Sequence, residues 1–386
     1  MDLPPLTYLT VDEVTRGVGA SQVLPYLERL SARGLAITLH SFEQREPELA
    51  VRERVTASGI DWRPHVFGRH GAAGGLGRVA RGARAVRHDA LVHARSDLPA
   101  AAALLGRPKA WVWDVRALWA DQRIALGLLR QGSPAERVLR KVESAAASRS
   151  SAITTLTQAA IDVLAQRHGE QVRSKATVIS TCVDLGRFSV EPLPPAEPVR
   201  LLLSGSFNQL YDLDLTRRFI TTLKELAPVE LTLLRDAPSS WDAAVAAMGG
   251  TIRSAAFQDM PAEVQASHAG LSICRMDIGT ALAGTAPTKI GEFLACGRPV
   301  VVSKGIGDLD DLINQGRCGV VLHDTSDASI RLAVTGLLGL LTDGETPARC
   351  RAAAEQAFAL EDGVSRLIDI YRRSQPRGSS RVGDTG

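Results

Sequence analysis

Short runs of apolar residues alternate along the chain with longer segments in which apolar positions recur every three or four residues. In the first half the short runs are Leu6–Thr10, Ala36–Ser41 and Ala90–Val92, and Gln22–Arg33 has the clearest helical periodicity. Apolar runs of this length predict buried strands. Their alternation with helical segments predicts an α/β fold built on parallel sheets.

The same alternation starts again after a proline-rich segment, residues 191–198, which we interpret as a linker. The strands expected beyond it are Val199–Leu203, Glu230–Leu234, Gly270–Cys274 and Pro299–Ser303. Two Rossmann-like domains are the simplest interpretation, with residues 1–190 in the first and 198–358 in the second. Residues 374–386 are polar and contain glycine, so we expect a disordered tail there.

Charge and cysteine content exclude several classes of protein. The 386 residues include 45 Lys plus Arg and 42 Asp plus Glu, and a net charge of +3 gives no support for nucleic-acid binding. Five scattered cysteines form neither a disulfide framework nor the paired spacing of a metal site, so we expect no bound metal and a reducing, cytoplasmic location. The sequence shows neither a signal peptide nor an apolar stretch long enough to span a membrane.

One predicted helix carries a row of arginines. Arg78, Arg81, Arg84 and Arg87 follow the glycine-rich residues 71–75 at three-residue spacing, which places them on one helical face. That face is either solvated or a docking surface for an anionic acceptor or a membrane.

The first candidate binding motif is the segment Gly17–Gln22, which follows the first strand and opens the first predicted helix. Gly17 and Gly19 would let the backbone approach a ligand at a helix N-terminus. The segment lacks the third glycine of the dinucleotide fingerprint, and a tight turn with Ser21 as helix cap is the alternative interpretation.

The strongest segment is residues 286–302, which predicts a turn, a short helix and a buried strand. Pro287 suits the first turn of the helix and Gly297 its end. In such a helix the amides of Thr288 and Lys289 face an anion, and Glu292 lies a turn further in, where its carboxylate could accept from ribose hydroxyls.

The run Pro287–Val301 resembles the nucleotide-sugar-binding segment of GT-B glycosyltransferases of the family-four, retaining type, in the branch with a Pro-Thr-Lys motif. The similarity extends in the same order to Gly17–Val23, Val92–Ser96, Asp114–Arg116, Thr181–Phe188 and Gly205–Ser206, and reaches about Tyr371. The resemblance implies two domains facing across a cleft, with a last helix, residues 361–373, returning to the first domain.

The resemblance also implies roles for donor-side residues. Glu292 would hold the ribose, Thr288 and Ile290 would offer backbone amides to phosphate, and Phe257 with Gln258 would lie beside the base. The remaining donor-side candidates are Gly17, Gly19, Gly205, Ser206, Arg275 and Lys289.

Two of these candidates have alternatives. The guanidinium of Arg275 would neutralise the departing diphosphate without a metal, or would form a surface ion pair. Lys289 is either a second phosphate cation or an exposed residue of the first helical turn.

Two positions depart from the family pattern. Gly284 stands where the first of two glutamates is usual, eight residues before Glu292, so recognition of the donor sugar differs. The loop Ser204–Phe207 lacks a basic residue that is frequent there.

The acceptor side carries Asp114, Arg116, His93 and Arg95, all at expected strand ends, where α/β sheets bind ligands. Asp114 either pairs with the arginines or accepts from an acceptor hydroxyl while the arginines bind an anion. His93 is interpreted as a satisfied strand histidine.

The resulting hypothesis is a metal-independent retaining glycosyltransferase without a cofactor. It would transfer sugar from a nucleoside diphosphate sugar, UDP before GDP, to a hydroxyl or amine of a small-molecule or lipid-linked acceptor. A sugar-nucleotide epimerase and a catalytically idle nucleotide-binding subunit are the alternatives. The sequence leaves the oligomeric state open.

Overall fold

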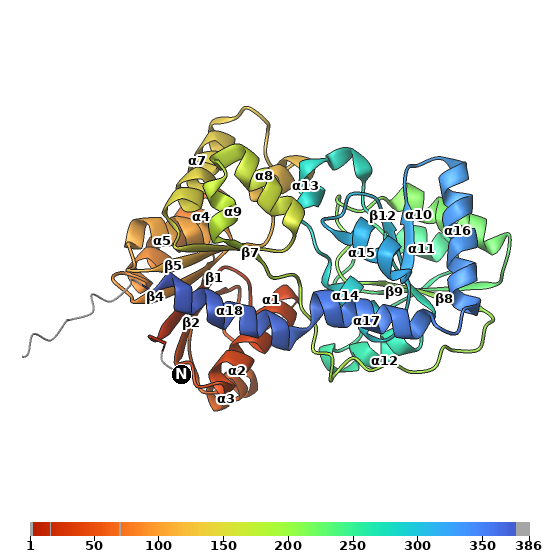
Figure 1. Cartoon of the computed structure of the whole chain (residues 1–386), viewed down its shortest axis with the longest axis horizontal. Helices are drawn as coiled ribbons and strands as arrows, with labels where there is room; N and C mark the ends of the chain where they lie inside the picture. The colour runs from red at the N-terminus through yellow and green to blue at the C-terminus, as the bar shows by residue number, and fades with distance from the viewer. Residues whose placement is uncertain (1–2, 16, 69–70, 376–386) are drawn as a thin grey trace, which may run out of the picture.

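The chain forms two parallel sheets, each covered by helices (Figure 1). The computed structural model describes residues 3–15, 17–68 and 71–375. The first sheet has the strand order β3-β2-β1-β4-β5-β6-β7 and the second has β10-β9-β8-β11-β12-β13, with neighbouring strands parallel. Both orders begin as in the dinucleotide-binding fold, so the predicted α/β architecture with two Rossmann-like halves is confirmed.

The strands of the first sheet are β1 (Leu6–Thr10), β2 (Ile37–Glu43), β3 (Ile60–Val66), β4 (Leu91–Arg95), β5 (Trp111–Val115), β6 (Ala152–Thr155) and β7 (Ala176–Val178). Its helices are α1 (Gly17–Gln22), α2 (Leu24–Ala32), α3 (Leu49–Ala57), α4 (Gly71–Ala85), α5 (Asp97–Gly106), α6 (Trp119–Ala125), α7 (Pro134–Arg149), α8 (Gln158–His168) and α9 (Gln171–Lys175).

The strands of the second sheet are β8 (Val199–Ser204), β9 (Val229–Leu234), β10 (Thr251–Arg253), β11 (Ala269–Ser272), β12 (Val300–Ser303) and β13 (Gly319–Leu322). Its helices are α10 (Leu213–Lys224), α11 (Asp242–Ala247), η1 (Phe257–Asp259), α12 (Met260–Gln265), η2 (Met276–Ile278), α13 (Thr280–Ala283), α14 (Thr288–Ala295), α15 (Leu309–Gly316), α16 (Asp327–Thr342) and α17 (Thr346–Phe358).

The last helix, α18 (Leu360–Ser374), leaves the second domain and packs against the first. Val364, Leu367 and Tyr371 are buried in the core that α2 and β1 also line, and Figure 1 shows α18 running along the first domain from the end of α17. Ser374 ends this helix and is buried, so the expected tail cannot begin there. The rest of that expected tail, apart from Gln375, lies outside the described residues.

The two chain crossings between the domains are joined by backbone hydrogen bonds. The amide of Val183 donates to Phe358 O at 2.7 Å, and the amide of Leu360 donates to Val183 O at 3.1 Å. Both crossings therefore form one hinge, with Ala359 opposite Val183.

Two arginines of the second domain hold the start of the proline-rich linker and the segment just before it. Arg298 is fully buried and donates to the carbonyls of Glu191 and Pro192 at 2.8 and 3.0 Å. Arg351 donates to the carbonyls of Phe188 and Leu185 at 2.7 and 3.2 Å. Residues 185–192 are thus fixed to the second domain. We therefore expect a rotation of one domain against the other to occur close to Val183.

The carboxyl ends of the two sheets face each other. Leu118 and Thr157, which follow β5 and β6, lie against Gly284 and Gly307, which follow β11 and β12. The loops that α/β sheets use for ligands therefore meet between the domains.

Candidate functional site

Helix α14 anchors the candidate site because its apolar face is buried against the second sheet. Ile290, Phe293 and Leu294 are fully buried, while a side chain at Gly291 would meet Val183 Cγ2 at 2.8 Å. The glycine therefore lets α14 lie against the hinge. The predicted helix is confirmed, with Pro287 as its N-cap residue. The amides of Thr288 and Lys289 have no hydrogen-bond partner among the described residues, whereas the amide of Ile290, which the resemblance assigned to phosphate, already donates to Pro287 O at 3.1 Å.

Lys289 extends from this first turn into an aromatic cage. Its side chain is 8% exposed, and Nζ lies 4.1 Å from the ring centroid of Phe207 and 4.5 Å from that of Tyr211. Within the described part of the chain Nζ has no hydrogen-bond partner. Burial lowers the pKa of Lys289 to about 8. Lys289 is thus not the exposed first-turn residue that the sequence left open.

The cage is built by the loop after β8. Gly205 has a φ of +96°, which favours glycine, and the Cβ position of any side chain there would lie 4.0 Å from Lys289 Cε. Gly205 and Ser206 are exposed beside the lysine. The loop Ser204–Phe207 has no basic residue of its own, but the ammonium group of Lys289 on α14 lies beside it.

Glu292 is a carboxylate without a partner one turn further along α14. It is half-buried, and no described residue forms a hydrogen bond or ion pair with its side chain. Burial raises the pKa of Glu292 to about 7, although Arg187 and Lys289 act in the opposite direction.

Arg187, from the segment before the linker, completes this group of charges. Its guanidinium carbon lies 3.8 Å from the ring centroid of Phe257, and its Nη2 donates to the carbonyl of Phe257. Burial lowers the pKa of Arg187, whereas Glu292 and Asp184 raise it. Phe257 is 42% exposed in η1, not at a strand end as expected, because β10 already ends at Arg253. Gln258 lies in the same turn.

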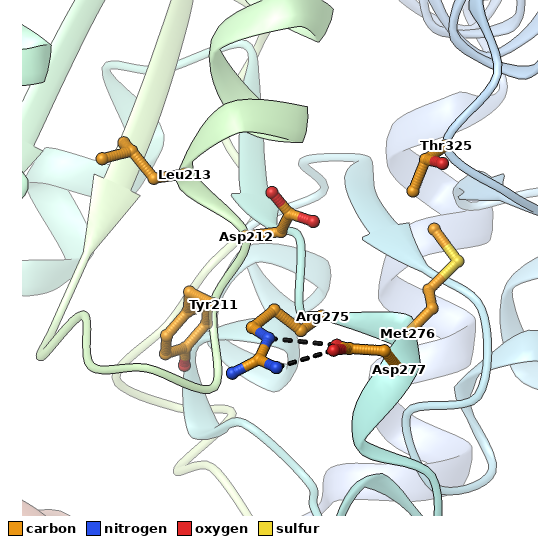
Figure 2. Close-up of a pocket in the computed structure, with 7 residues that line it drawn as sticks. All are labelled: Tyr211, Asp212, Leu213, Arg275, Met276, Asp277 and Thr325. Atoms are coloured by element: carbon orange, nitrogen blue, oxygen red, sulfur yellow. Dashed lines mark hydrogen bonds and ion pairs between the residues drawn. The ribbon is translucent and has the colours of Figure 1, made fainter. Parts of the chain in front are cut away.

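Arg275 does not join this group. The strand expected over Gly270–Cys274 already ends at Ser272. Arg275 forms a bidentate ion pair with Asp277 at 2.7 and 3.0 Å. Both residues line a cavity of about 340 Å³ with Tyr211 and Asp212, as Figure 2 shows. Thr288, Lys289 and Glu292 do not line it. The surface ion pair, one of the two interpretations of Arg275, is what the structure contains.

On the first domain, Asp114 is the centre of a buried polar network. Its carboxylate is contacted by Thr154 Oγ1 at 2.8 Å, His93 Nε2 at 3.2 Å, Arg95 Nη1 at 3.3 Å and Arg116 Nη1 at 3.4 Å. Burial alone would raise the pKa of Asp114, but Arg116, His93 and Arg95 outweigh it and hold the pKa well below its usual range. The pairing of Asp114 with both arginines is thus present in the structure.

Partners outside the sheet complete the network. Arg95 is 2% exposed and Nε bonds Asp12 at 2.7 Å, while His93 Nδ1 lies 3.0 Å from the hydroxyl of Tyr371 on α18. His93 is thus a buried strand histidine, but it is only partly satisfied, because Nε2 lies 3.2 Å from Asp114 without forming a hydrogen bond to a described residue. Tyr371 connects the returning helix to the carboxyl end of the first sheet.

The two glycines of the segment Gly17–Gln22 are required for different reasons. Gly17 has a φ of +51° and open space where a side chain would lie, so a ligand could approach it. A Cβ at Gly19 would lie 1.9 Å from Glu13 O, so this glycine is required by its own loop. Ser21 lies inside α1 and donates to Gly17 O at 3.1 Å, so the interpretation of Ser21 as a helix cap is wrong.

The arginine row is only partly an exposed face. Arg78 is half-buried with its guanidinium 4.7 Å from the ring centroid of Phe67, whereas Arg81, Arg84 and Arg87 are exposed. The exposure of these three arginines is compatible with both interpretations of the helix face, a solvated face and a docking surface.

Neither a metal cluster nor a membrane span is found in the part of the chain that the structure describes. No three His, Cys, Asp or Glu side chains gather in an arrangement that could hold a metal ion, and the five cysteines are free and buried. No described helix is both long and apolar enough to cross a bilayer.

Comparisons with known proteins define the class of fold. No family model matches the sequence, and no curated protein matches it. Among solved structures, sucrose-phosphate synthase from Thermosynechococcus elongatus superposes with a TM-score of 0.74 at 12% identity, covering 96% of this chain and 98% of that one. The chain therefore has the GT-B fold of glycosyltransferases.

Two further solved structures cover nearly the same length. HepE from Anabaena, in complex with UDP and glucose, gives a TM-score of 0.68 at 16% identity over 95% of this chain and 98% of that chain. WaaG, a glycosyltransferase involved in lipopolysaccharide biosynthesis, gives 0.66 at 14% identity over 95% and 99%. At these identities the likeness describes the fold alone.

Sequence reasoning missed the residues that surround the two charges of α14. Arg187 stands in the segment Thr181–Phe188 that carried part of the family resemblance, but only its contact with Phe257 indicates a role. Phe207 and Tyr211 form the lysine cage from a loop about 80 residues earlier in the chain. No local pattern links these positions.

Proposed function

We propose that this chain is a retaining glycosyltransferase that uses a nucleoside diphosphate sugar, with UDP as the preferred nucleotide. The carrying observation is the buried ammonium of Lys289, which has no hydrogen-bond partner and lies at the first turn of α14. A buried cation without a partner is costly, and a diphosphate would supply the missing negative charge.

The donor would lie along α14. Its diphosphate would accept from the amides of Thr288 and Lys289 and from Lys289 Nζ, where the helix dipole also favours negative charge. The unpartnered carboxylate of Glu292 would accept hydrogen bonds from the ribose hydroxyls. Gly205 and Ser206 would leave space for the phosphates.

The base would meet the exposed ring of Phe257 and the guanidinium of Arg187. Both offer flat surfaces on which a heterocycle can stack. The Anabaena relative in fold was solved with UDP and with UDP-glucose, which supports UDP as the first nucleotide to test.

The chemistry would need neither a metal nor a protein base. Lys289 and the amides of α14 would stabilise the negative charge that develops on the departing diphosphate. An oxygen of that diphosphate would take the proton of the acceptor hydroxyl or amine on the same face of the sugar, which retains the configuration. Asp114 would organise the acceptor side through its arginines, because its oxygens already accept from Thr154, Arg95 and Arg116.

Two positions on the donor side, Arg275 and Gly284, would take part differently from what the family resemblance implied. Arg275 would reach a phosphate only by exchanging its ion pair with Asp277. Gly284 brings no carboxylate to the donor sugar, and a Cβ there would lie 2.8 Å from the amide nitrogen of Leu118. This position favours the idle nucleotide-binding subunit as the second candidate.

A thermal-shift titration with UDP, GDP and their sugars tests the proposal. UDP at 100 times its Kd should stabilise the protein by about 2.7 kcal/mol. The Glu292→Gln variant should lose most of that shift, whereas Glu53→Gln, an exposed glutamate outside the site, should keep it. An unchanged shift in Glu292→Gln would refute the ribose assignment, and UDP binding without sugar transfer to any acceptor would indicate the idle subunit.

A further inference from the structure

The domains touch at a second place, far along the interface from the hinge. Figure 1 shows α13 beside α8, on the opposite side of the interface from α17 and α18. There the carboxylate of Asp308 accepts from the amides of Gln158 at 2.6 Å and Ala159 at 3.0 Å. Thr157 Oγ1 also donates to the carbonyl of Ala283. All three bonds join the first domain to the second.

Asp308 acts as a helix cap supplied by the other domain. Gln158 and Ala159 are the first two residues of α8, whose amides have no partner within the helix, and Thr157 already caps Ala160 at 3.0 Å. A carboxylate at this end also interacts favourably with the helix dipole. Asp308 itself is exposed, so water competes for the same amides when the domains separate.

Two glycines allow the close approach. At Gly307 a Cβ would lie 2.5 Å from Thr157 Cγ2, and at Gly284 it would lie 2.8 Å from Leu118 N. Gly307 N also donates to Leu282 O at 2.9 Å, which ties the loop after β12 to the loop after β11. The contact therefore reaches the residues 279–285 that lead into α14.

We propose that Asp308 is a positioning residue, an interdomain latch that holds the domains closed and sets residues 279–285 against the first domain. Closure pivots on the hinge at Val183 and Ala359, and release of the latch opens the path to α14. That this motion admits and discharges a nucleotide sugar rests on the proposed function. The latch itself does not.

Distances between spin labels test the latch directly. Labels at Glu53→Cys and Leu332→Cys report on the two domains, because both positions are exposed and the native cysteines are buried. Loss of a helix cap of typical strength corresponds to about a fivefold change in the closed-to-open ratio. Asp308→Ala, which removes both acceptor oxygens, should therefore raise the population of longer distances, and Asp308→Lys, which places a cation at the same helix end, should raise it further.

The matched control is Asp311→Ala, at an exposed carboxylate on α15 that forms no side-chain hydrogen bond or ion pair with any described residue. It should leave the distances unchanged. Distances in both Asp308 variants equal to those of this control would overturn the latch. The KM for UDP-sugar should rise in Asp308→Ala with kcat less affected, which a purely local role of the cap would not cause.

The two proposals fail in different ways. If UDP does not bind to the unaltered protein, the proposed function is wrong, and the label distances still decide the latch.

Discussion

Replacement of Lys289 by methionine tests the central feature of the site, a cation buried without a partner. Methionine keeps the apolar length that fills the cage of Phe207 and Tyr211 and removes only the charge. The variant should therefore be more stable than the unaltered protein and bind UDP less tightly. These two effects have opposite signs and one physical cause.

The magnitude follows from the surroundings of the lysine. Burial lowers the pKa of Lys289 from 10.5 to about 8. At about 1.4 kcal/mol for each pKa unit, keeping the side chain protonated near pH 7 costs about 3 kcal/mol. The ring contacts return about 1–2 kcal/mol. A net gain of about 1–2 kcal/mol in unfolding free energy should thus raise the Tm of this 386-residue chain by roughly 1–3 °C.

The loss of affinity is estimated from the bond that the variant cannot form. A hydrogen bond between charged groups contributes about 1.5–3 kcal/mol, so UDP should bind roughly 10 to 100 times more weakly. Thermal melting without ligand and calorimetric titration with UDP measure the two effects. Lys304→Met, at an exposed lysine outside the site, is the control. A variant that melts earlier and binds UDP as tightly as the unaltered protein would refute the reasoning.

Three further predictions concern other parts of the molecule. Because burial raises the pKa of Glu292 from 4.5 to about 7, the ligand-free protein should lose stability as the pH rises through this interval, and melting curves of Glu292→Gln should lack that component. Asp114→Asn should lower the unfolding free energy by about 3–5 kcal/mol in denaturant titrations, because it leaves Arg95 buried without a full partner; a change below 1 kcal/mol would contradict this. Gly284→Ala should shift the spin-label distances toward opening, since its Cβ cannot lie 2.8 Å from Leu118 N, and unchanged distances would show that the loop adapts.

Lys289 and Glu292 of α14 show which features of the site can be predicted from the sequence. Pro287, Gly297 and the apolar positions between them predict a short helix before a buried strand, and the structure confirms it. The positions of Lys289 and Glu292 on that helix follow from its periodicity. Their lack of partners does not, because it depends on every segment that packs around them.

Arg275 is a position whose surroundings the sequence did not predict. The apolar run before it predicts a strand over Gly270–Cys274, and a residue directly after that strand end would face the other domain. The strand ends at Ser272, so the backbone turns and Arg275 pairs with Asp277 only two residues away. Arg187 takes the place beside Glu292, although more than one hundred residues separate the two in sequence.

The sequence by itself determined the two parallel α/β halves, the helix and strand around residue 290, and the place of His93 in a buried strand. These features depend on local periodicity and on turn residues, which act over a few positions. Tertiary structure alone decided which charges are left without partners, how Arg187 meets Phe257, and that Asp308 caps a helix of the other domain. Such contacts join segments far apart in the chain, so they exist only once packing has brought the segments together.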